Sequence, residues 1–296
     1  MKEIVIDVQK VSKKYKKSET LALSDITFQV EKGAIAAFLG PNGAGKSTMI
    51  KIILGIIRAT EGHSCLLGRD SAKLDASIYR QIGVFMGGKT NLIQLLPVMD
   101  SLKYISSIYH APRIVFQNNV NKYGELLQCG EFLSRPVSTL SLGQRIRAEL
   151  LSILIYNPQV LILDEPTLGL DIEGKKVIHH MLRNLSEETG ITILLTTHDL
   201  IGLDRLCGQI MLINHGKKLI DWTKEELTGY LQEATIVETD MEFTQYSKEL
   251  VDTNRYLLNQ KQLVECKNIL AAKGNSYTFV RYSQPTMEDL LYAYYR

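Results

Sequence analysis

Nine consecutive residues in the first fifth of the chain form a complete phosphate-binding motif, G-x-x-x-x-G-K-S/T. They are Gly40, Pro41, Asn42, Gly43, Ala44, Gly45, Lys46, Ser47 and Thr48. Glycines let backbone N–H groups close around phosphate oxygens, the lysine reaches the β- and γ-phosphates, and the serine hydroxyl binds Mg²⁺. The sequence therefore predicts a nucleoside triphosphate site, with Ser47 as a metal ligand.

Two carboxylates, Asp164 and Glu165, follow the apolar stretch Leu161-Ile162-Leu163 further along the chain. At the end of a strand, Asp164 can hold Mg²⁺ directly or through water, while Glu165 can polarise an attacking water. Acidic residues that merely end a strand are common in α/β proteins. The phosphate-binding motif upstream favours the catalytic interpretation.

The residues around the phosphate-binding motif predict the elements that position it. Residues 34–39 form a continuous apolar run, as in a buried parallel strand. Ile50, Ile53, Leu54 and Ile57 then recur with helical spacing. Such a helix directs its positive end at the phosphates. A chance glycine-rich turn would not be expected to lie between a strand and a helix in this way.

Composition excludes several classes of protein. The chain has 296 residues, 45% of them hydrophobic, which is enough for a large core and two domains. The net charge is only +2, so no global field attracts nucleic acid, and none is expected as a partner. The four cysteines form no C-x-x-C pair and are interpreted as buried thiols in a reducing compartment. No signal-peptide pattern or long apolar run occurs, so any membrane role is expected to be peripheral.

The remaining pattern predicts an α/β body followed by a distinct tail. Residues 100–156 have a helical pattern, and the apolar runs 160–163, 191–196 and 210–213 are predicted strands, the first two joined by a parallel crossover. From residue 222 onward the chain holds eight of the fourteen tyrosines and is acidic on balance. Strands over 234–238 and 276–282 and a helix over 287–295 predict a small α+β domain there.

The stretch Leu140-Ser141-Leu142-Gly143-Gln144 resembles the L-S-G-G-Q signature of ATP-binding-cassette (ABC) ATPases. Ser141 and Gln144 also form a capping box that opens an amphipathic helix. The two interpretations are compatible, since a capped helix N-terminus with a free hydroxyl and a glycine N–H is a good clamp for a γ-phosphate. Leu142 stands where the family usually has glycine, but the phosphate-facing Ser141 and Gly143 are present.

Three further residues match the family over residues 1–221. His198, in Thr196-Thr197-His198-Asp199, matches the switch histidine, Asp171 matches the D-loop aspartate, and Tyr15 lies where the family stacks an aromatic ring on adenine. Each has a simpler alternative. His198 can be an ordinary histidine at a strand end, Asp171 a helix cap, and Tyr15 an aromatic in a solvated basic turn.

The resemblance implies a fold and an activity. It implies an α/β P-loop NTPase of the ABC type, with a mixed sheet core and a helical subdomain at about 88–157, over residues 1–221. Residues 222–296 are expected to form a small C-terminal accessory or regulatory α+β domain. The activity implied is ATP hydrolysis with Mg²⁺, in which Glu165, His198 and Lys46 are catalytic, and Ser47 and Asp164 hold the metal.

The family also implies partners. Two cassettes face head to tail, so the phosphate loop of one subunit binds ATP and Ser141, Gly143 and Gln144 of the other cover it, with Asp171 at the interface. Because this chain carries both halves of the composite site, a homodimer is expected. Integral membrane permease subunits are the other expected partners, at the cytoplasmic face of the cell membrane.

One departure from the family affects coupling to those subunits. After the predicted strand 82–85, the family carries a glutamine that touches the metal or its water and relays to the membrane partner. The residues here are Met86-Gly87-Gly88-Lys89-Thr90-Asn91. The sequence leaves open whether Asn91 or Gln94 substitutes for the missing glutamine.

The short tail and single cassette favour the ATPase of a multi-gene exporter. An importer ATPase has nearly the same cassette and remains an alternative. An ABC ATPase acting on nucleic acid or ribosomes usually carries two cassettes or a long coiled-coil insertion, and this sequence has neither.

Overall fold

The computed structural model describes residues 3–16, 18–241, 243, 246, 250–252, 255–273 and 279–295. The chain divides into two compact units, Met1–Asp221 and Trp222–Arg296. In the described part of the chain, no helix combines the length and the apolar character needed to cross a membrane.

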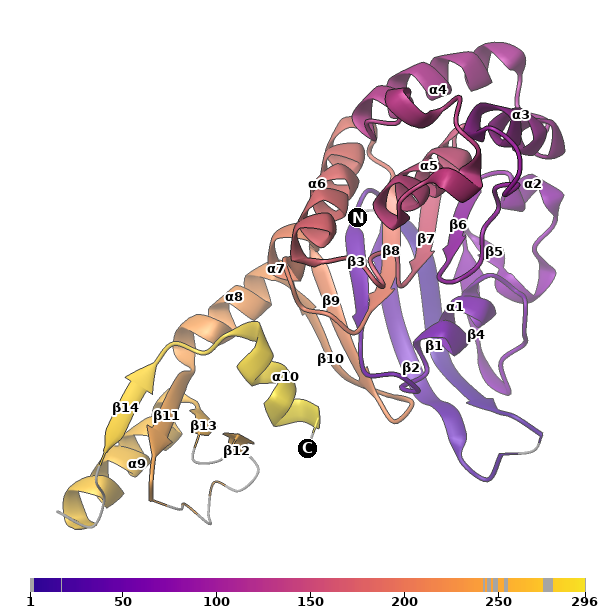
Figure 1. Cartoon of the computed structure of the whole chain (residues 1–296). Coiled ribbons are helices and arrows are strands. Elements are labelled where there is room, and N and C mark those ends of the chain that lie inside the picture. Colours follow the sequence, from indigo (N-terminus) through magenta and orange to yellow (C-terminus); the bar gives the residue numbers. More distant parts are fainter. Residues whose placement is uncertain are drawn as a thin grey trace. The chain divides into compact units, whose positions relative to one another are not determined.

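A six-stranded sheet forms the centre of the first unit, with strand order β10-β9-β3-β8-β7-β6 (Figure 1). The pairs that β3 makes with β8 and β9, and β7 with β6 and β8, are parallel. Their apolar runs reflect burial on both faces, as parallel sheets require. The strands are β3 (Ile35–Leu39), β6 (Ile82–Met86), β7 (Val160–Asp164), β8 (Thr192–Thr197), β9 (Gln209–Asn214) and β10 (Lys217–Thr223).

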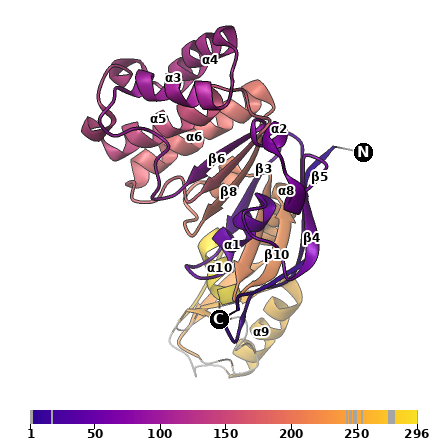
Figure 2. The same ribbon diagram turned by 90° about the vertical axis from the view of Figure 1, so that its right-hand side faces the viewer.

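A second sheet of four strands, in the order β2-β1-β4-β5, pairs antiparallel. Helix α1 (Lys46–Ile53) contacts β2, β4 and β7, and lies between the two sheets (Figure 2). Its Ile50 and Ile53 join Phe28 and Phe38 in a single buried core. The strands are β1 (Ile4–Lys14), β2 (Leu21–Glu31), β4 (Glu61–Leu66) and β5 (Arg69–Asp70).

The helix after the phosphate-binding motif is shorter than its apolar spacing predicts. It ends at Ile53, whereas the pattern extends to Ile57. Gly55 adopts a left-handed φ of +67° and passes so close to Ser71 that a Cβ there would lie 2.1 Å from the Ser71 carbonyl oxygen. Ile57 nevertheless packs against the core. The spacing predicted the burial of Ile57 correctly, but the helix ends where Gly55 passes close to Ser71, the first residue of a 3₁₀ turn.

Three helices occupy the region for which the sequence has a helical pattern. They are grouped together at one end of the unit (Figure 1), and α5 contacts both α3 and α4. Short 3₁₀ turns at Gly130–Phe132 and Val137–Thr139 interrupt the region. The helices of the first unit besides α1 are α2 (Ala76–Tyr79), α3 (Val98–Ile108), α4 (Arg113–Leu126), α5 (Leu142–Leu154), α6 (Ile172–Thr189) and α7 (Leu203–Leu206).

The second unit is an α+β fold, with a sheet of order β12-β13-β11-β14 around its own core. Strand β14 begins at Val280, within the predicted strand 276–282, of which residues 276–278 lie outside the described residues. The predicted terminal helix is confirmed as α10 (Met287–Tyr295). The other elements are α8 (Lys224–Glu233), β11 (Thr235–Thr239), β12 (Leu250–Asp252), β13 (Arg255–Leu258), α9 (Gln260–Lys273) and β14 (Val280–Ser283).

The start of α10 is fixed by polar contacts. Asp289 Oδ2 accepts hydrogen bonds from Thr286 N–H and from the Thr286 hydroxyl, both at 2.9 Å. The other oxygen of this buried carboxylate lies 2.9 Å from Arg255, at the end of the neighbouring β13. A buried carboxylate requires such partners. The contacts of Asp289 with Thr286 and Arg255 therefore hold the start of α10 against the sheet of the second unit.

The cysteines provide a test of the core. Cys129, Cys207 and Cys266 are buried and Cys65 is half-buried. Burial raises the pKa of Cys129 to about 12 and raises that of Cys207 further. Since the thiolate is the reactive form, a raised pKa slows alkylation at neutral pH. In the folded protein at about pH 8, Cys65 should be alkylated first, although burial raises its pKa as well. Peptide mass mapping with and without denaturant measures this, and rapid labelling of folded Cys207 would contradict it.

Candidate nucleotide-binding and catalytic site

The phosphate-binding motif forms a tight loop between β3 and α1. Gly45 precedes α1 with φ +110°, and a Cβ on it would lie 2.7 Å from the Ala22 carbonyl oxygen. A Cβ on Gly40 would lie 2.3 Å from the Ile213 carbonyl oxygen. Both positions therefore require glycine. The loop encloses a cavity of about 220 Å³, lined by residues 41–48 together with Ala22 and Glu165.

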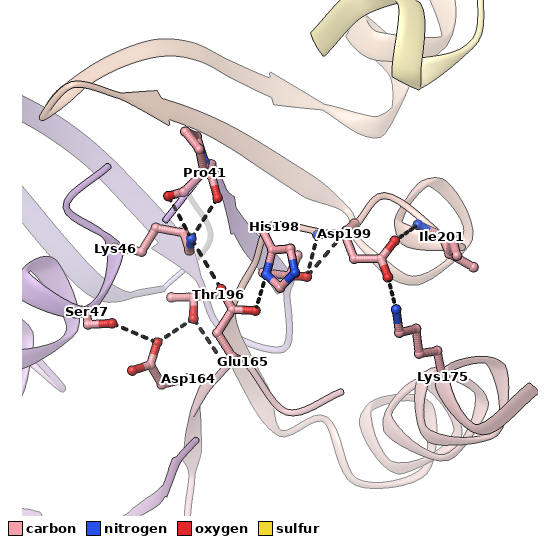
Figure 3. Close-up of polar contacts among 12 residues, drawn as sticks. Pro41, Lys46, Ser47, Asp164, Glu165, Lys175, Thr196, His198, Asp199 and Ile201 are labelled. Atoms are coloured by element: carbon pink, nitrogen blue, oxygen red, sulfur yellow. Dashed lines mark hydrogen bonds and ion pairs between the residues drawn. The ribbon is translucent and has the colours of Figure 1, made fainter. Parts of the chain in front are cut away.

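Lys46 is held at this cavity by the loop itself. Its ammonium group donates to the carbonyl oxygens of Gly40, at 2.6 Å, and Pro41, at 3.1 Å (Figure 3). It also lies 3.2 Å from Glu165 Oε1, and only 6% of the side chain is exposed. A buried ammonium is stable only when it is paired. These contacts place a cation where the motif predicts phosphates.

Asp164, the last residue of β7, lies next to Ser47 of α1, as a metal site built from both residues requires. Asp164 Oδ1 accepts hydrogen bonds from Thr196 Oγ1, at 2.6 Å, and from Ser47 Oγ, at 3.3 Å. Mg²⁺ prefers oxygen ligands and commonly takes one or two from the protein and the rest from water and substrate phosphates. The hydroxyl of Ser47 and the carboxylate of Asp164 fit that ion, beside the phosphate cavity.

Glu165 turns its side chain toward the phosphate cavity through an unusual backbone conformation. Its φ of +52° lies in the left-handed region, which costs a non-glycine residue of order 1–2 kcal/mol. Its N–H donates to Thr196 Oγ1 at 3.0 Å, which helps hold this conformation. Its carboxylate then lies between Lys46 and His198, with Oε2 2.9 Å from His198 Nδ1. Strained residues supported in this way are typical of active sites.

His198 stands on a turn after β8 that is anchored by Asp199. Asp199 Oδ2 pairs with Lys175 of α6, and Oδ1 accepts from Ile201 N–H at 3.0 Å. Burial acts to raise the pKa of Asp199, but the hydrogen bonds from Lys175 and Ile201 outweigh it and hold this pKa below its ordinary value. Lys175 and Thr196 are thus supporting residues that the sequence analysis did not identify, although Thr196 lies in the motif Thr-Thr-His-Asp.

Tyr15 lies at the end of β1, next to the phosphate loop. Its hydroxyl is 3.3 Å from Thr48 Oγ1, and 41% of the residue is exposed. Lys13 Nζ lies 5.5 Å from the ring centroid. The ring is therefore available for stacking beside the motif that is predicted to bind phosphates.

The other predicted site residues lie elsewhere. Ser141 caps α5 and forms the predicted capping box with Gln144, which is confirmed. Asp171 caps α6 through Gly174 N–H, at 2.8 Å. Leu142 lies close to the segment before α6, because a Cβ built on Gly169 would be 3.1 Å from the Leu142 Cδ2 atom. Ser141, Gly143, Gln144 and Asp171 do not line the phosphate-loop cavity of their own chain.

The segment after β6 leaves little room for a side chain at its first residue. Gly87 N–H donates to the Asp164 carbonyl oxygen at 2.9 Å, and a Cβ on Gly87 would lie 2.8 Å from the same oxygen. Asn91 Nδ2 lies 3.5 Å from the Val84 carbonyl oxygen, and the Gln94 carbonyl oxygen accepts from Ser138 N–H at 2.9 Å. The Asn91 side chain therefore faces β6, and Gln94 lines a cavity of about 280 Å³ that Gly87 and Glu165 also line.

The sequence is similar to members of a known protein family. The family model described as "ABC transporter" matches residues 23–168. The zinc uptake system ATP-binding protein ZurA of Listeria innocua is 34% identical over 77% of this chain and 89% of its own length. The Nod factor export ATP-binding protein I of Cupriavidus pinatubonensis is 30% identical over 75% of this chain and 67% of its own.

A solved structure extends the agreement to the fold. The dimeric ATP-binding cassette MJ0796, in a post-hydrolysis state bound to ADP and Pi, has a TM-score of 0.65 and 26% identity, covering 74% of this chain and 98% of that one. The fold class predicted from the sequence is confirmed. On its phosphate loop, its strand-end carboxylates and these similarities, the chain belongs to the ABC transporter ATP-binding proteins, a family that hydrolyses ATP.

Proposed function

We propose that this chain powers a membrane exporter through ATP-driven closure of a homodimer, coupled to separate integral membrane subunits at the cytoplasmic face of the cell membrane. The first unit, residues 1–221, is the ATPase domain, and residues 222–296 form an accessory domain that serves dimer contacts or regulation. The observation that carries the proposal is the position of Glu165 between Lys46 and His198, at the cavity of the phosphate loop.

The site residues divide the chemistry among them. Lys46 exchanges the carbonyl oxygens of the loop for the β- and γ-phosphates, and this exchange separates it from Glu165. Glu165 then accepts the proton of the attacking water, and His198 contacts the γ-phosphate. Ser47 and Asp164 would hold Mg²⁺, which would supply positive charge against the charge that develops on the phosphoryl group. Tyr15 stacks on the adenine.

Four predicted site residues at the starts of α5 and α6 support the dimer. Ser141, Gly143 and Gln144 lie at the N-terminus of α5, where N–H groups and the helix dipole favour an anion. Placed across an interface, they cover the γ-phosphate bound to the partner, with Asp171 nearby. Since one chain carries both halves, two copies form two equivalent sites.

The direction of transport needs a test of its own, because the name of one relative describes uptake and that of another describes export. The test is copurification of the full chain from membranes and identification of the integral subunits that accompany it. ATP-dependent loss of substrate from cells or from right-side-out vesicles supports export. A solute-binding protein required for activity would establish the importer alternative instead.

The segment 87–96 gives a prediction about coupling. The double change Asn91→Ala and Gln94→Ala should leave the ATPase activity of the isolated subunit within about 3-fold of wild type, which corresponds to about 0.6 kcal/mol. The reason is that the proposed metal ligands are Ser47 and Asp164, whereas Asn91 Nδ2 lies 3.5 Å from the Val84 carbonyl oxygen of β6. We place the contact with the membrane subunits at this segment, where the family carries the glutamine that relays to them, so stimulation by those subunits should fall much further. Both activities are measured side by side. A collapse of the isolated ATPase would assign a metal-side role to one of these residues.

A further inference from the structure

A buried carboxylate outside the catalytic cavity joins two parts of the ATPase domain. Glu149 lies in α5 and is only 3% exposed. Its Oε1 accepts a short hydrogen bond from the Thr90 hydroxyl, and its Oε2 accepts from Asn91 N–H at 3.2 Å. Thr90 in turn accepts from Leu92 N–H at 3.0 Å. Glu149 thus fixes the segment 90–92 to α5, the helix that begins at the L-S-G-G-Q-like stretch.

The segment 87–92 is fixed at its other end to β7, the strand that ends at Asp164. Gly87 N–H donates to the carbonyl oxygen of Asp164, the residue before the proposed base. Between the two attachments stands Gly88, with φ +78°. A cavity of about 280 Å³ adjoins both attachments, lined among others by Gly87, Thr90, Arg145, Glu149 and Glu165. The segment 87–92 is therefore a short link between Asp164–Glu165 and α5.

Helix α5 connects this link to Ser141, at the helix N-terminus proposed to clamp the γ-phosphate. Ser141, its N-cap, precedes Glu149 by eight positions, or about 12 Å along a helix at 1.5 Å per residue. The capping box of Ser141 and Gln144 fixes the first turn. Figure 1 shows α5 as one continuous helix. A displacement of the segment 87–92 at Glu149 therefore moves the Ser141 end as well.

Packing alone does not explain a carboxylate at this position. An apolar side chain would fill the space without the cost of burying a polar group. Burial raises the pKa of Glu149, while the hydrogen bonds from Thr90 and Asn91 and the charge of Arg145 counteract this in part. What the carboxylate provides is two acceptor oxygens for a segment that consists of exposed residues from Gly87 to Asn91.

We propose that Glu149 is a positioning residue that transmits the state of the segment 87–92, beside the Asp164–Glu165 carboxylates of one ATP site, to Ser141, which covers the ATP site of the partner subunit. The inference rests on the proposed function, since only a closed dimer places Ser141 at a second site. Glu149 takes the linking role through α5, whereas the usual glutamine after β6 is absent.

The test compares Glu149→Leu, Glu149→Gln and Thr90→Val with an exposed control in the same helical region, Glu125→Gln. Three quantities are measured on the full chain: binding of a fluorescent ADP analogue, the ATP concentration needed for dimerisation in a Glu165→Gln background, and the Hill coefficient and kcat of the ATPase. Circular dichroism melting establishes that each variant is folded.

We expect Glu149→Leu to keep ADP affinity, to lose cooperativity in ATP hydrolysis and to need about 10-fold more ATP for dimerisation, a typical coupling strength. Glu149→Gln keeps an acceptor for Thr90 but presents an amide donor to Asn91 N–H, so its loss should be smaller. Thr90→Val should show a loss of about the same size as Glu149→Gln. Thr90→Val combined with Glu149→Leu should be no worse than Glu149→Leu alone, because the two act through one contact.

Four outcomes distinguish failure of the inference from failure of the proposed function. Wild-type cooperativity and dimerisation in folded Glu149→Leu would overturn the inference and leave the proposed function standing. A parallel loss of ADP affinity and thermal stability would assign Glu149 a merely structural role, which also overturns it. If Glu149→Leu does not fold, Thr90→Val at the exposed end of the contact decides. Failure of the Glu165→Gln protein itself to dimerise with ATP would refute the proposed function.

Discussion

Replacing Glu165 by glutamine is expected to lower ATP turnover by ~10²- to 10⁴-fold, the range for loss of a general base. The glutamine amide has the same shape as the carboxylate but cannot accept the proton of the attacking water. Glu165 is the residue we expect to act as the base, because its carboxylate lies between Lys46, at 3.2 Å, and His198, at 2.9 Å. Steady-state hydrolysis at saturating ATP measures the effect.

The same variant should retain nucleotide and dimerise. Lys46 leaves Glu165 when it turns to the phosphates, so removing that negative charge does not weaken ATP binding. Hydrolysis no longer reopens the closed dimer, and size-exclusion chromatography with ATP and Mg²⁺ should show the protein at twice its mass. Glu188→Gln, which changes an exposed carboxylate on α6, is the control and should behave as wild type. Unchanged turnover in the Glu165 variant would reassign the base, with His198 as the next residue to test.

Local sequence patterns predicted those parts of the site that local geometry determines. The phosphate loop was recognisable because Gly40 and Gly45 leave no room for a Cβ, and that constraint is written in the residue types themselves. The buried strands β3, β7 and β8 were visible as apolar runs for a similar reason. The capping box at Ser141 needs only a Ser and a Gln three residues apart.

Contacts between distant segments were not predictable in this way. Thr90 and Glu149 are 59 residues apart, and Lys175 and Asp199 are 24 apart. No periodicity or motif marks such pairs, because they are created when β6, α5 and α6 assemble. The predicted end of α1 was wrong for the same reason, because the helix stops where Gly55 meets Ser71, 16 residues further along the chain. In the second unit, β12 and β13 are short strands of three and four residues, below the length at which alternation is informative.

Ser141→Asp should abolish ATP-driven dimerisation while leaving nucleotide binding to the isolated subunit intact. Aspartate is as good an N-cap as serine, so α5 should keep its start. Across the proposed interface, however, its carboxylate would face the γ-phosphate. Two like charges about 4 Å apart cost about 1 kcal/mol in water and about 4 kcal/mol near a protein surface, and a symmetric dimer has two such contacts. The closed dimer should therefore weaken by several orders of magnitude, and turnover should fall with it.

Ser141→Gly and Ser141→Arg complete the test, because they separate capping from the clamp. Glycine weakens an N-cap by only a few tenths of a kcal/mol and leaves room for phosphate, so dimerisation should fall modestly. Arginine fills the clamp and removes the cap, so it should block dimerisation and also lower the melting temperature. Light scattering with ATP in a Glu165→Gln background measures dimerisation, and a fluorescent ADP analogue measures binding to the monomer. Dimerisation of the aspartate variant at wild-type ATP concentrations would place Ser141 away from the γ-phosphate. Isolation of a complex with one copy of this chain and one different cassette chain would instead refute the homodimer, because the two sites would then be unequal.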